Sequence, residues 1–152
     1  MKQAGEHKFR ILLIEDNPAD VELLRRAFAS AKLDCDLTLL EDGEEALAFL
    51  RRLETQADEP SPDLTVLDLN LPKNDGVEVL QAMRASPAFA TMPVAVLSSS
   101  PFSRERARIE PYGVGRYITK PADLDEFLQI GFILKELLTT GGTSTGEPGV
   151  KS

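Results

Sequence analysis

Short apolar segments and helical patterns alternate five times along this chain, and the alternation restricts the fold more than any other feature of the sequence. The apolar segments have the pattern of buried strands, and they lie at 9–14, 35–41, 63–68, 93–98 and 115–119. Helical patterns follow them from residue 18, at 43–53, at 76–84, near 103–110 and at 122–138. Strands that are separated by helices form a parallel sheet with right-handed crossovers and helices on both faces. We therefore expect an α/β fold with a doubly wound, five-stranded parallel sheet.

Three of the expected helices carry signals at their ends. Asn17 is a favoured N-cap residue and Pro18 is favoured at the first helical position. Asp42 has the spacing of a capping box before the second helix. The fourth helix is the weakest, because Pro111 stands where its last turn should be and proline breaks a helix interior. We expect this helix to be shortened to about 103–109.

The length and charge limit the classes of protein to which the chain can belong. Its 152 residues are the size of one domain, and we expect the folded part to be 9–138. A polar leader at 1–8 precedes it, and a Gly-, Ser- and Thr-rich tail at 139–152 is expected to be disordered, which leaves no output domain. The net charge of −8 argues against nucleic-acid binding, which needs clustered Lys and Arg.

Few reactive side chains are available for other chemistries. Cys35 is the one cysteine, so a disulfide within the chain is impossible. His7 is the one histidine, so the chain offers few ligands for a zinc site and few candidate bases for Ser-His-Asp catalysis. No apolar segment is long enough for a signal peptide or a membrane span. We therefore expect a cytoplasmic protein with no membrane partner.

Polar and charged side chains stand at the carboxyl ends of four expected strands. Glu15 and Asp16 follow the first strand, Asp68 ends the third, Ser98 ends the fourth and Lys120 follows the fifth. In a doubly wound sheet the functional cleft lies beyond the carboxyl ends of the strands. Each residue alone could be a polar cap, but together they should bring three carboxylates, a hydroxyl and an ammonium into one cleft.

This combination of side chains points to phosphoryl chemistry. Clustered carboxylates repel one another unless a cation lies among them, and ligands that are all oxygen favour Mg2+. An aspartate beside such a metal can act as a nucleophile towards a phosphoryl group. Lys120 would supply positive charge to that group. The sequence therefore predicts a Mg2+-dependent phosphoryl-transfer site around Asp68.

Four motifs stand in order at these strand ends: EDNPAD (15–20), LDLNLP followed by DG (67–76), VLSSS (96–100) and ITKPAD (118–123). Together they resemble the response-regulator receiver domain of bacterial two-component systems, over residues 9–138. The resemblance implies a flavodoxin-like fold with strand order 2-1-3-4-5. EDNPAD with LDLNLPKNDG is similar to the single-domain regulators that accompany phytochrome-type histidine kinases. We therefore expect a sensor histidine kinase of that type as a partner, and a downstream protein whose identity the sequence does not give.

The resemblance also implies roles for residues at matching positions. Asp68 is implied as the phosphoacceptor. Mg2+ is implied to be held by Asp16, Asp68, the backbone carbonyl of Asn70 and, through water, Glu15. Such a domain is a signalling protein rather than an enzyme, with limited self-catalysed phosphotransfer and autodephosphorylation.

Three further residues are implied to contact or respond to the phosphoryl group. Ser98 and Lys120 would contact it, and Ser98 and Tyr117 would switch an interaction surface after phosphorylation. The Lys120–Pro121 bond resembles the cis peptide of the family. Asp20 is interpreted instead as a residue favoured by the positive end of a helix, and not as a metal ligand.

Two other functions compete with this interpretation. A haloacid-dehalogenase-like phosphatase would also use Asp68 as its nucleophile. Such enzymes have the pattern Asp-x-Asp, whereas Asn70 stands at the second position, and its amide cannot shuttle a proton at neutral pH. A flavin-binding domain on a related sheet would need a phosphate-cradling loop after the first strand, where this chain has EDNPAD.

The last helix suggests a homodimer, because it carries more apolar residues than packing on the sheet requires. The set that suits the sheet is Leu124, Phe127, Leu128, Leu134 and Leu138, and the set on the opposite side is Ile130, Ile133 and Leu137. An exposed apolar patch of this kind indicates an interface. We expect a homodimer through this helix and the fifth strand, including Tyr117, unless a loop or the tail covers the patch.

Overall fold

A computed structural model describes residues 8–56, 60–71 and 75–140 of the chain. The leader predicted at 1–8 and the disorder predicted at 139–152 therefore fall almost wholly outside the described residues. Within them, no helix is both long and apolar enough to cross a membrane.

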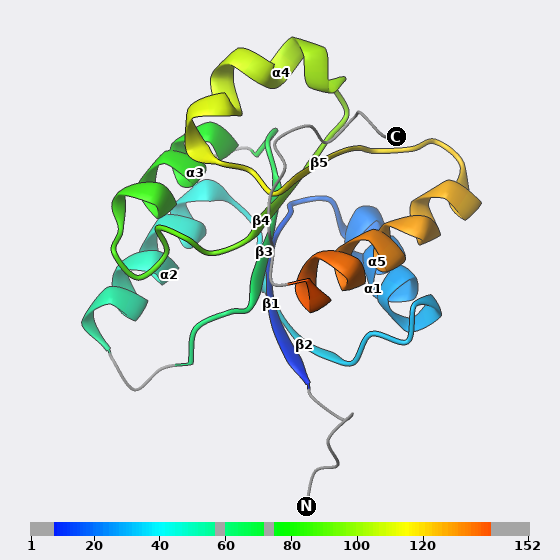
Figure 1. The fold of residues 1–152 in the computed structure, drawn as a ribbon, viewed down its shortest axis with the longest axis horizontal. Helices are drawn as coiled ribbons and strands as arrows, with labels where there is room; N and C mark the ends of the chain where they lie inside the picture. Colours follow the sequence, from blue (N-terminus) through cyan, green and yellow to red (C-terminus); the bar gives the residue numbers. More distant parts are fainter. Residues whose placement is uncertain (1–7, 57–59, 72–74, 141–152) are drawn as a thin grey trace, which may run out of the picture.

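Five parallel strands form one sheet at the centre of the molecule (Figure 1). They are β1 (Phe9–Ile14), β2 (Cys35–Leu40), β3 (Leu64–Asp68), β4 (Val94–Ser98) and β5 (Arg116–Thr119). Their order across the sheet is β2-β1-β3-β4-β5, which confirms the predicted strand order and fold class. The strand ends stay in register: Ile14 lies beside Leu67 in β3, and Ser98 lies beside Thr119 in β5.

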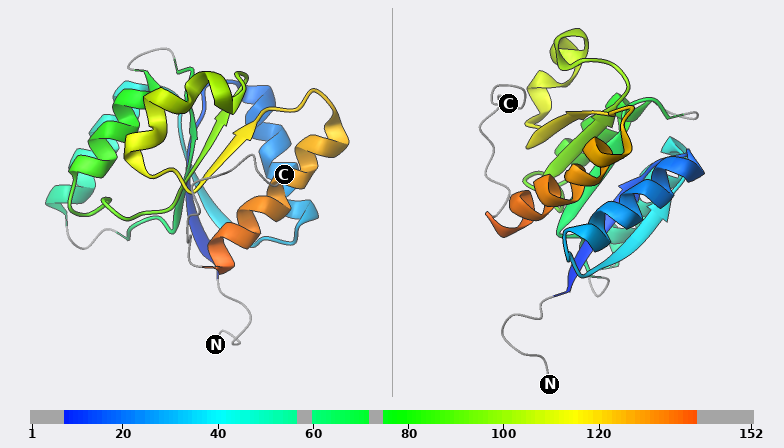
Figure 2. Two further views of the ribbon diagram at one scale, coloured as in Figure 1. Left: turned by 45° about the horizontal axis from the view of Figure 1, so that its top comes forward. Right: turned by 90° about the vertical axis from the view of Figure 1, so that its right-hand side faces the viewer.

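Helices cover both faces of this sheet, as Figures 1 and 2 show. They are α1 (Pro18–Ser30), α2 (Gly43–Thr55), α3 (Gly76–Ala85), α4 (Phe102–Ile109) and α5 (Leu124–Thr139). α1 and α5 pack together on one face, while α2, α3 and α4 lie on the other. The central strands β3 and β4 are buried on both sides, which explains their continuous apolar sequences.

The helix starts follow the sequence signals closely. Asn17 Oδ1 accepts hydrogen bonds from the backbone N–H of Ala19 and of Asp20, and it thereby caps α1. Asp42 Oδ1 accepts one from Glu45 N–H at the start of α2. The Glu45 carboxylate accepts one from the N–H of Glu41. These caps fix where each helix leaves the carboxyl edge of the sheet.

The fourth helix is short, as the prolines predict. α4 begins at Phe102, one residue earlier than expected, and ends at Ile109. A 3-10 turn, η1 (Glu110–Tyr112), then contains Pro111. Gly113 follows with a φ of 62°, a left-handed conformation that glycine adopts without steric cost. The short α4 and this turn therefore bring the chain back to β5.

The rotation of α5 about its axis contradicts the predicted dimer interface. Ile130 and Leu137 are only 1% and 7% exposed and belong to the core, so they cannot form an exposed patch. Ile133 is partly buried against the same core, whereas Leu124, which was expected on the sheet, is 47% exposed. Tyr117 is also buried, at 5% exposed.

The reason is the close approach of α5 to α1 at Gly131. A Cβ atom built on Gly131 would lie only 2.0 Å from the Ala27 carbonyl oxygen, so the two helix backbones touch there. Ile130 and Leu137 lie on the same face of α5 as Gly131, and they therefore face the core. The prediction for Ile130 and Leu137 was wrong because glycine, which has no apolar side chain to mark the pattern, lies at the centre of the packed face.

Candidate functional site

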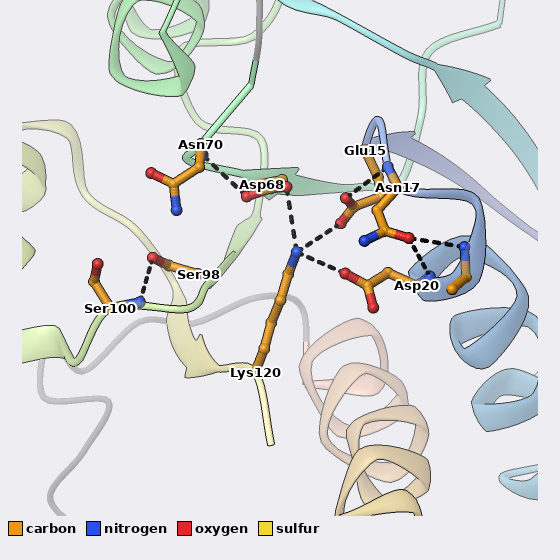
Figure 3. A network of polar contacts seen from close by, with 9 residues as sticks. Glu15, Asn17, Asp20, Asp68, Asn70, Ser98, Ser100 and Lys120 are labelled. Carbon is orange, nitrogen blue, oxygen red and sulfur yellow. Dashed lines mark hydrogen bonds and ion pairs between the residues drawn. The ribbon is translucent and has the colours of Figure 1, made fainter. Parts of the chain in front are cut away.

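The polar residues at the strand ends gather in one cluster beyond the carboxyl edge of the sheet (Figure 3). Glu15 follows β1, Asp68 is the last residue of β3, and Lys120 follows β5. The backbone N–H of Lys120 donates to the Ser98 carbonyl at 2.8 Å, which continues the pairing of β4 with β5 by one residue. The sheet thus places Lys120 opposite the two carboxylates.

The Lys120 ammonium contacts three carboxylates of the cluster. Its Nζ lies 2.9 Å from Asp20 Oδ2, 3.2 Å from Glu15 Oε1 and 3.3 Å from Asp68 Oδ2. Figure 3 shows the side chain rising between these carboxylates. Only 14% of the Lys120 side chain is exposed, so solvent screens these ion pairs less than it would screen surface pairs.

The backbone orients the two buried carboxylates. Asp68 is 3% exposed, and its Oδ1 accepts a hydrogen bond from Asn70 N–H at 2.9 Å. This bond leaves Oδ2 facing Lys120. Glu15 is 1% exposed, and its Oε2 accepts from Asn17 N–H at 3.1 Å. Each carboxylate therefore has one oxygen held by the loop that follows its strand.

Burial and crowding change the acidity of two groups. Burial raises the pKa of Glu15 to about 8, the Asp68 carboxylate adds to the rise, and Lys120 opposes it. Burial acts to lower the pKa of Lys120, but the hydrogen bond to Asp20 and the charges of Asp68 and Glu15 outweigh it and raise that pKa above its ordinary value. Without a metal ion, Glu15 therefore keeps its proton at neutral pH, which lowers the negative charge beside the Lys120 ammonium.

The donor set fits a hard divalent cation. Glu15, Asp16 and Asp68 each offer a carboxylate oxygen, and these oxygens lie within 4.8 Å of one another. Glu15 Oε1 is buried, and its polar neighbour among the described residues is the Lys120 ammonium, 3.2 Å away. Asp16 is exposed, which leaves room for water ligands. A set of three converging carboxylate oxygens is the kind of site that Mg2+ or Mn2+ occupies.

A second group of predicted residues lies beside the cluster, at the end of β4. The Ser98 side chain is fully buried, and its Oγ accepts from Ser100 N–H at 3.0 Å. The Tyr117 hydroxyl donates to the Ser100 carbonyl at 2.5 Å. The Tyr117 ring packs against Phe102 of α4, with 5.3 Å between ring centroids. The segment from Ser100 to the start of α4 therefore contacts both the Ser98 hydroxyl and the aromatic residue of β5.

Burial raises the pKa of the Tyr117 hydroxyl, and a contact with the Ser98 hydroxyl opposes the rise. Tyr117 therefore stays a neutral hydrogen-bond donor at ordinary pH. Its partner, the Ser100 carbonyl, is a backbone atom, and no sequence pattern marks such a contact.

Two features of the site differ from the sequence-based prediction. The described residues include no cis peptide, so the prediction for the Lys120–Pro121 bond was wrong. The Lys120 side chain reaches the carboxylates from a trans bond, and its backbone N–H donates to the Ser98 carbonyl in the β4–β5 ladder. Asp20 is also more than a helix-end residue, since it makes the shortest contact of the Lys120 ammonium.

Sequence reasoning missed Gly76, which lies against the backbone of Asp68 and Leu69. A Cβ atom built on Gly76 would lie 2.6 Å from Leu69 Cα and 2.7 Å from the Asp68 carbonyl oxygen. The Gly76 N–H donates to the Leu69 carbonyl at 3.1 Å. The first residue of α3 thus packs directly on the backbone beside Asp68. The DG pair that follows LDLNLP was the available signal.

Comparison with known protein families defines the class of this chain. A model of the response regulator receiver domain matches residues 11–131, and the chain belongs to this family. The fold and the cluster of Glu15, Asp16 and Asp68 agree with that class. The match leaves the phosphatase and flavin-binding alternatives without support.

The chain is similar to regulators from several microorganisms. It is 36% identical over 120 residues to response regulator Rcp1 from Synechocystis sp. (strain ATCC 27184 / PCC 6803 / Kazusa). The aligned region covers 79% of this chain and 82% of Rcp1. It is 35% identical over 132 residues to the probable methanogenesis regulatory protein FilR2 from Methanothrix harundinacea (strain 6Ac), covering 87% and 84% of the two chains.

Solved structures extend the comparison. The phosphorylated cyanobacterial phytochrome response regulator RcpA matches with a TM-score of 0.79 and 37% identity, over 90% of this chain and 98% of that chain. The Mn2+-bound form of Rcp1 matches with a TM-score of 0.76 and 34% identity, over 87% and 96%. These similarities confirm the predicted resemblance to phytochrome-associated regulators.

Proposed function

We propose that this protein is a phosphoacceptor switch, which receives a phosphoryl group on Asp68 from a sensor histidine kinase. The observation that supports this most strongly is the setting of the Asp68 carboxylate. It is 3% exposed at the end of β3, it lies 3.3 Å from the Lys120 ammonium, and it shares an oxygen cluster with Glu15 and Asp16. Burying several carboxylates around one cation costs free energy of folding, and proteins keep such a cluster where it takes part in a reaction.

In the proposed reaction an Asp68 carboxylate oxygen attacks phosphorus. The bond from phosphorus to the donor, a kinase histidine nitrogen or the oxygen of a small donor, breaks and its electron pair leaves with the donor group. Asn70 N–H and the Lys120 ammonium orient the nucleophile before the attack. Lys120 then donates to a phosphoryl oxygen, because charge-assisted hydrogen bonds stabilise the charge that develops there.

Mg2+ is the cation that we propose for the oxygen cluster. Asp16, Asp68 and the backbone carbonyl of Asn70 would hold it, with Glu15 bound through water. When bound, it supplies positive charge that offsets the charge of the phosphoryl oxygens. The Mn2+ found in Rcp1 supports a divalent cation in general. Because phosphoryl transfer needs little beyond positioning and charge, we also propose limited self-catalysed phosphotransfer and autodephosphorylation.

Ser98 and Tyr117 are the proposed switch. The Ser98 hydroxyl would rotate from the Ser100 N–H towards a phosphoryl oxygen, and Ser100 would then lose one of its two side-chain contacts. The segment that begins α4 would change its conformation as a consequence, and Tyr117 would follow through its bond to Ser100. Such a switch works by favouring one of two surface conformations.

The proposed partners are supported by the similarity to RcpA, by the net charge and by the exposed apolar residues of α5. A phytochrome-type kinase is proposed because RcpA is a phytochrome response regulator. A cytoplasmic location is proposed with it, because histidine kinases draw their phosphoryl group from cytoplasmic ATP. An unidentified downstream protein would read the switch, and the net charge of −8 disfavours nucleic acid as that reader. A homodimer is retained as a proposal, now through the α5 surface that exposes Leu124 and Phe132, and analytical ultracentrifugation tests it.

Incubation with a small phosphodonor and Mg2+, followed by intact-mass measurement, tests the function. We expect the wild-type protein to gain one phosphoryl group and Asp68→Asn to gain none. A protein that takes up no phosphoryl group from several donors would contradict the proposal.

A further inference from the structure

The closest partner of Lys120 lies outside the proposed metal cluster. The ammonium is 2.9 Å from Asp20, compared with 3.2 Å from Glu15 and 3.3 Å from Asp68. Asp20 is not among the three residues whose oxygens converge. The proposed transfer to Asp68 therefore leaves the role of Asp20 unexplained.

Phosphorylation changes the other two carboxylates that Lys120 contacts. Asp68 would carry the phosphoryl group on one of its oxygens, and Glu15 belongs to the cluster that fits a cation. Asp20 undergoes neither change. Its backbone is fixed in the first turn of α1, where its N–H donates to Asn17 Oδ1 at 3.3 Å. Of the three contacts of Lys120, the one with Asp20 is the contact that can persist through the reaction.

The burial of the Lys120–Asp20 ion pair allows Asp20 to hold the Lys120 ammonium in place. The side chains of Lys120 and Asp20 are 14% and 18% exposed, so water competes weakly for their ion pair. A lysine side chain has several rotatable bonds, and fixing it costs conformational entropy. A second carboxylate on a different element reduces that freedom, because it holds the ammonium from the α1 side while Asp68 and later the phosphoryl group hold it from the β3 side (Figure 3).

We propose that Asp20 is a positioning residue for phosphoryl transfer, which anchors the Lys120 ammonium towards Asp68 while Asp68 and Glu15 change partners. This inference rests on the proposed role of Asp68 as phosphoacceptor. No bond to Asp20 forms or breaks during the transfer. Lys120 keeps its protons and moves one hydrogen bond from Asp68 to a phosphoryl oxygen, while its bond to Asp20 stays in place.

Rates of phosphorylation measured against phosphodonor concentration test the inference. Asp20→Asn keeps the size of the side chain and removes its charge, whereas Asp20→Glu keeps the charge. Glu126→Gln is the matched control, because Glu126 is the third residue of α5 as Asp20 is the third of α1. We expect Asp20→Asn to lower the maximal rate about tenfold, as misplacing a catalytic group does. The donor concentration that gives the half-maximal rate should not change, Asp20→Glu should restore part of the rate, and Glu126→Gln should match the wild type.

An Asp20→Asn variant that reacts as fast as the wild type, or faster, would overturn the inference. A faster rate would mean that the charge of Asp20 repels the incoming phosphoryl group more than it positions Lys120. In a Lys120→Ala background, Asp20→Asn should have no further effect on the rate. A further loss there would mean that Asp20 acts through another residue, which also overturns the inference.

A second measurement does not depend on phosphorylation. Urea unfolding of the wild type, Asp20→Asn, Lys120→Ala and the double variant in a metal chelator measures the coupling between the two side chains. The double variant should shift the midpoint by less than the sum of the single shifts, and additive shifts would contradict the anchor. A wild type that takes up no phosphoryl group overturns the function of Asp68 and the inference with it. A phosphorylated wild type with an unaffected Asp20→Asn overturns the inference alone.

Discussion

Replacing Gly76 by alanine should destabilise the protein and slow its phosphorylation, because this glycine packs on the backbone that carries Asp68. The added Cβ would lie 2.6 Å from Leu69 Cα, 2.7 Å from the Asp68 carbonyl oxygen and 2.8 Å from the Leu69 carbonyl oxygen. All three are backbone atoms, so neither a rotamer change nor a small side-chain shift relieves the overlap. Either the backbone of Asp68 and Leu69 or the start of α3 must shift, and we expect this shift to displace the Asp68 carboxylate.

Two opposing effects set the magnitude. Alanine favours a helix over glycine by about 1 kcal/mol in a helix interior, and by less at the first helical position, where Gly76 stands. Overpacking of a tight site costs about 1–3 kcal/mol. We therefore expect a net loss of about 1–2 kcal/mol, with overpacking as the larger effect, and a fall in Tm of several degrees.

Thermal unfolding and the rate of phosphorylation from a small phosphodonor are the two measurements. Gly131→Ala is the matched control, because its Cβ would also overlap backbone, at Ala27 between α1 and α5, but away from Asp68. We expect both variants to lose stability and only Gly76→Ala to lose phosphorylation rate at a temperature where both are folded. A Gly76→Ala variant as stable and as reactive as the wild type would show that the contact of Gly76 with this backbone does not position Asp68.

Three further predictions concern single side chains. Lys120→Ala should remain folded by circular dichroism but lose most of its phosphorylation, because the phosphoryl group then lacks its cation; global unfolding would show that Lys120 is structural. The pKa of Glu15 is raised to about 8 from 4.5, so the folded protein retains a proton that the unfolded chain loses. Without metal, the free energy of unfolding should therefore fall as pH rises from about 4.5 to 8, and Glu15→Gln should flatten this dependence; equal slopes for the two proteins would contradict it. Ser86 Oγ is buried without a hydrogen-bond partner in the described part of the chain, so Ser86→Ala should raise the free energy of unfolding by about 1 kcal/mol in urea titrations; a loss of stability would show a missed partner.

The local signals predicted most of the fold because each one depends on neighbouring residues alone. Asn17 and Asp42 cap their helices through side chains only two or three residues away. The amino-acid sequence alone was enough to place the strand-end residues together, since parallel strands bring their carboxyl ends to one edge. This rule explains why Glu15, Asp68 and Lys120 were found as a group.

The errors come from features that sequence periodicity does not contain. The face of α5 that meets the core is set by the backbone contact of Gly131 with Ala27, and apolar residues occur on both of its sides. Asp20 has the position of an ordinary helix-end acid, and its bond to Lys120 joins residues 100 positions apart. The Tyr117 contact with the Ser100 carbonyl is of the same kind, because its acceptor is a backbone atom.

The site of phosphorylation can be located on the chain by chemical reduction and mass spectrometry. After incubation with a phosphodonor and Mg2+, borohydride reduction converts an aspartyl phosphate to homoserine, and peptide mass spectrometry then identifies the converted residue. We expect conversion at Asp68, with no conversion at Asp16, Asp20 or Glu15. Conversion at any residue other than Asp68, or a phosphoryl group that borohydride does not remove, would contradict it.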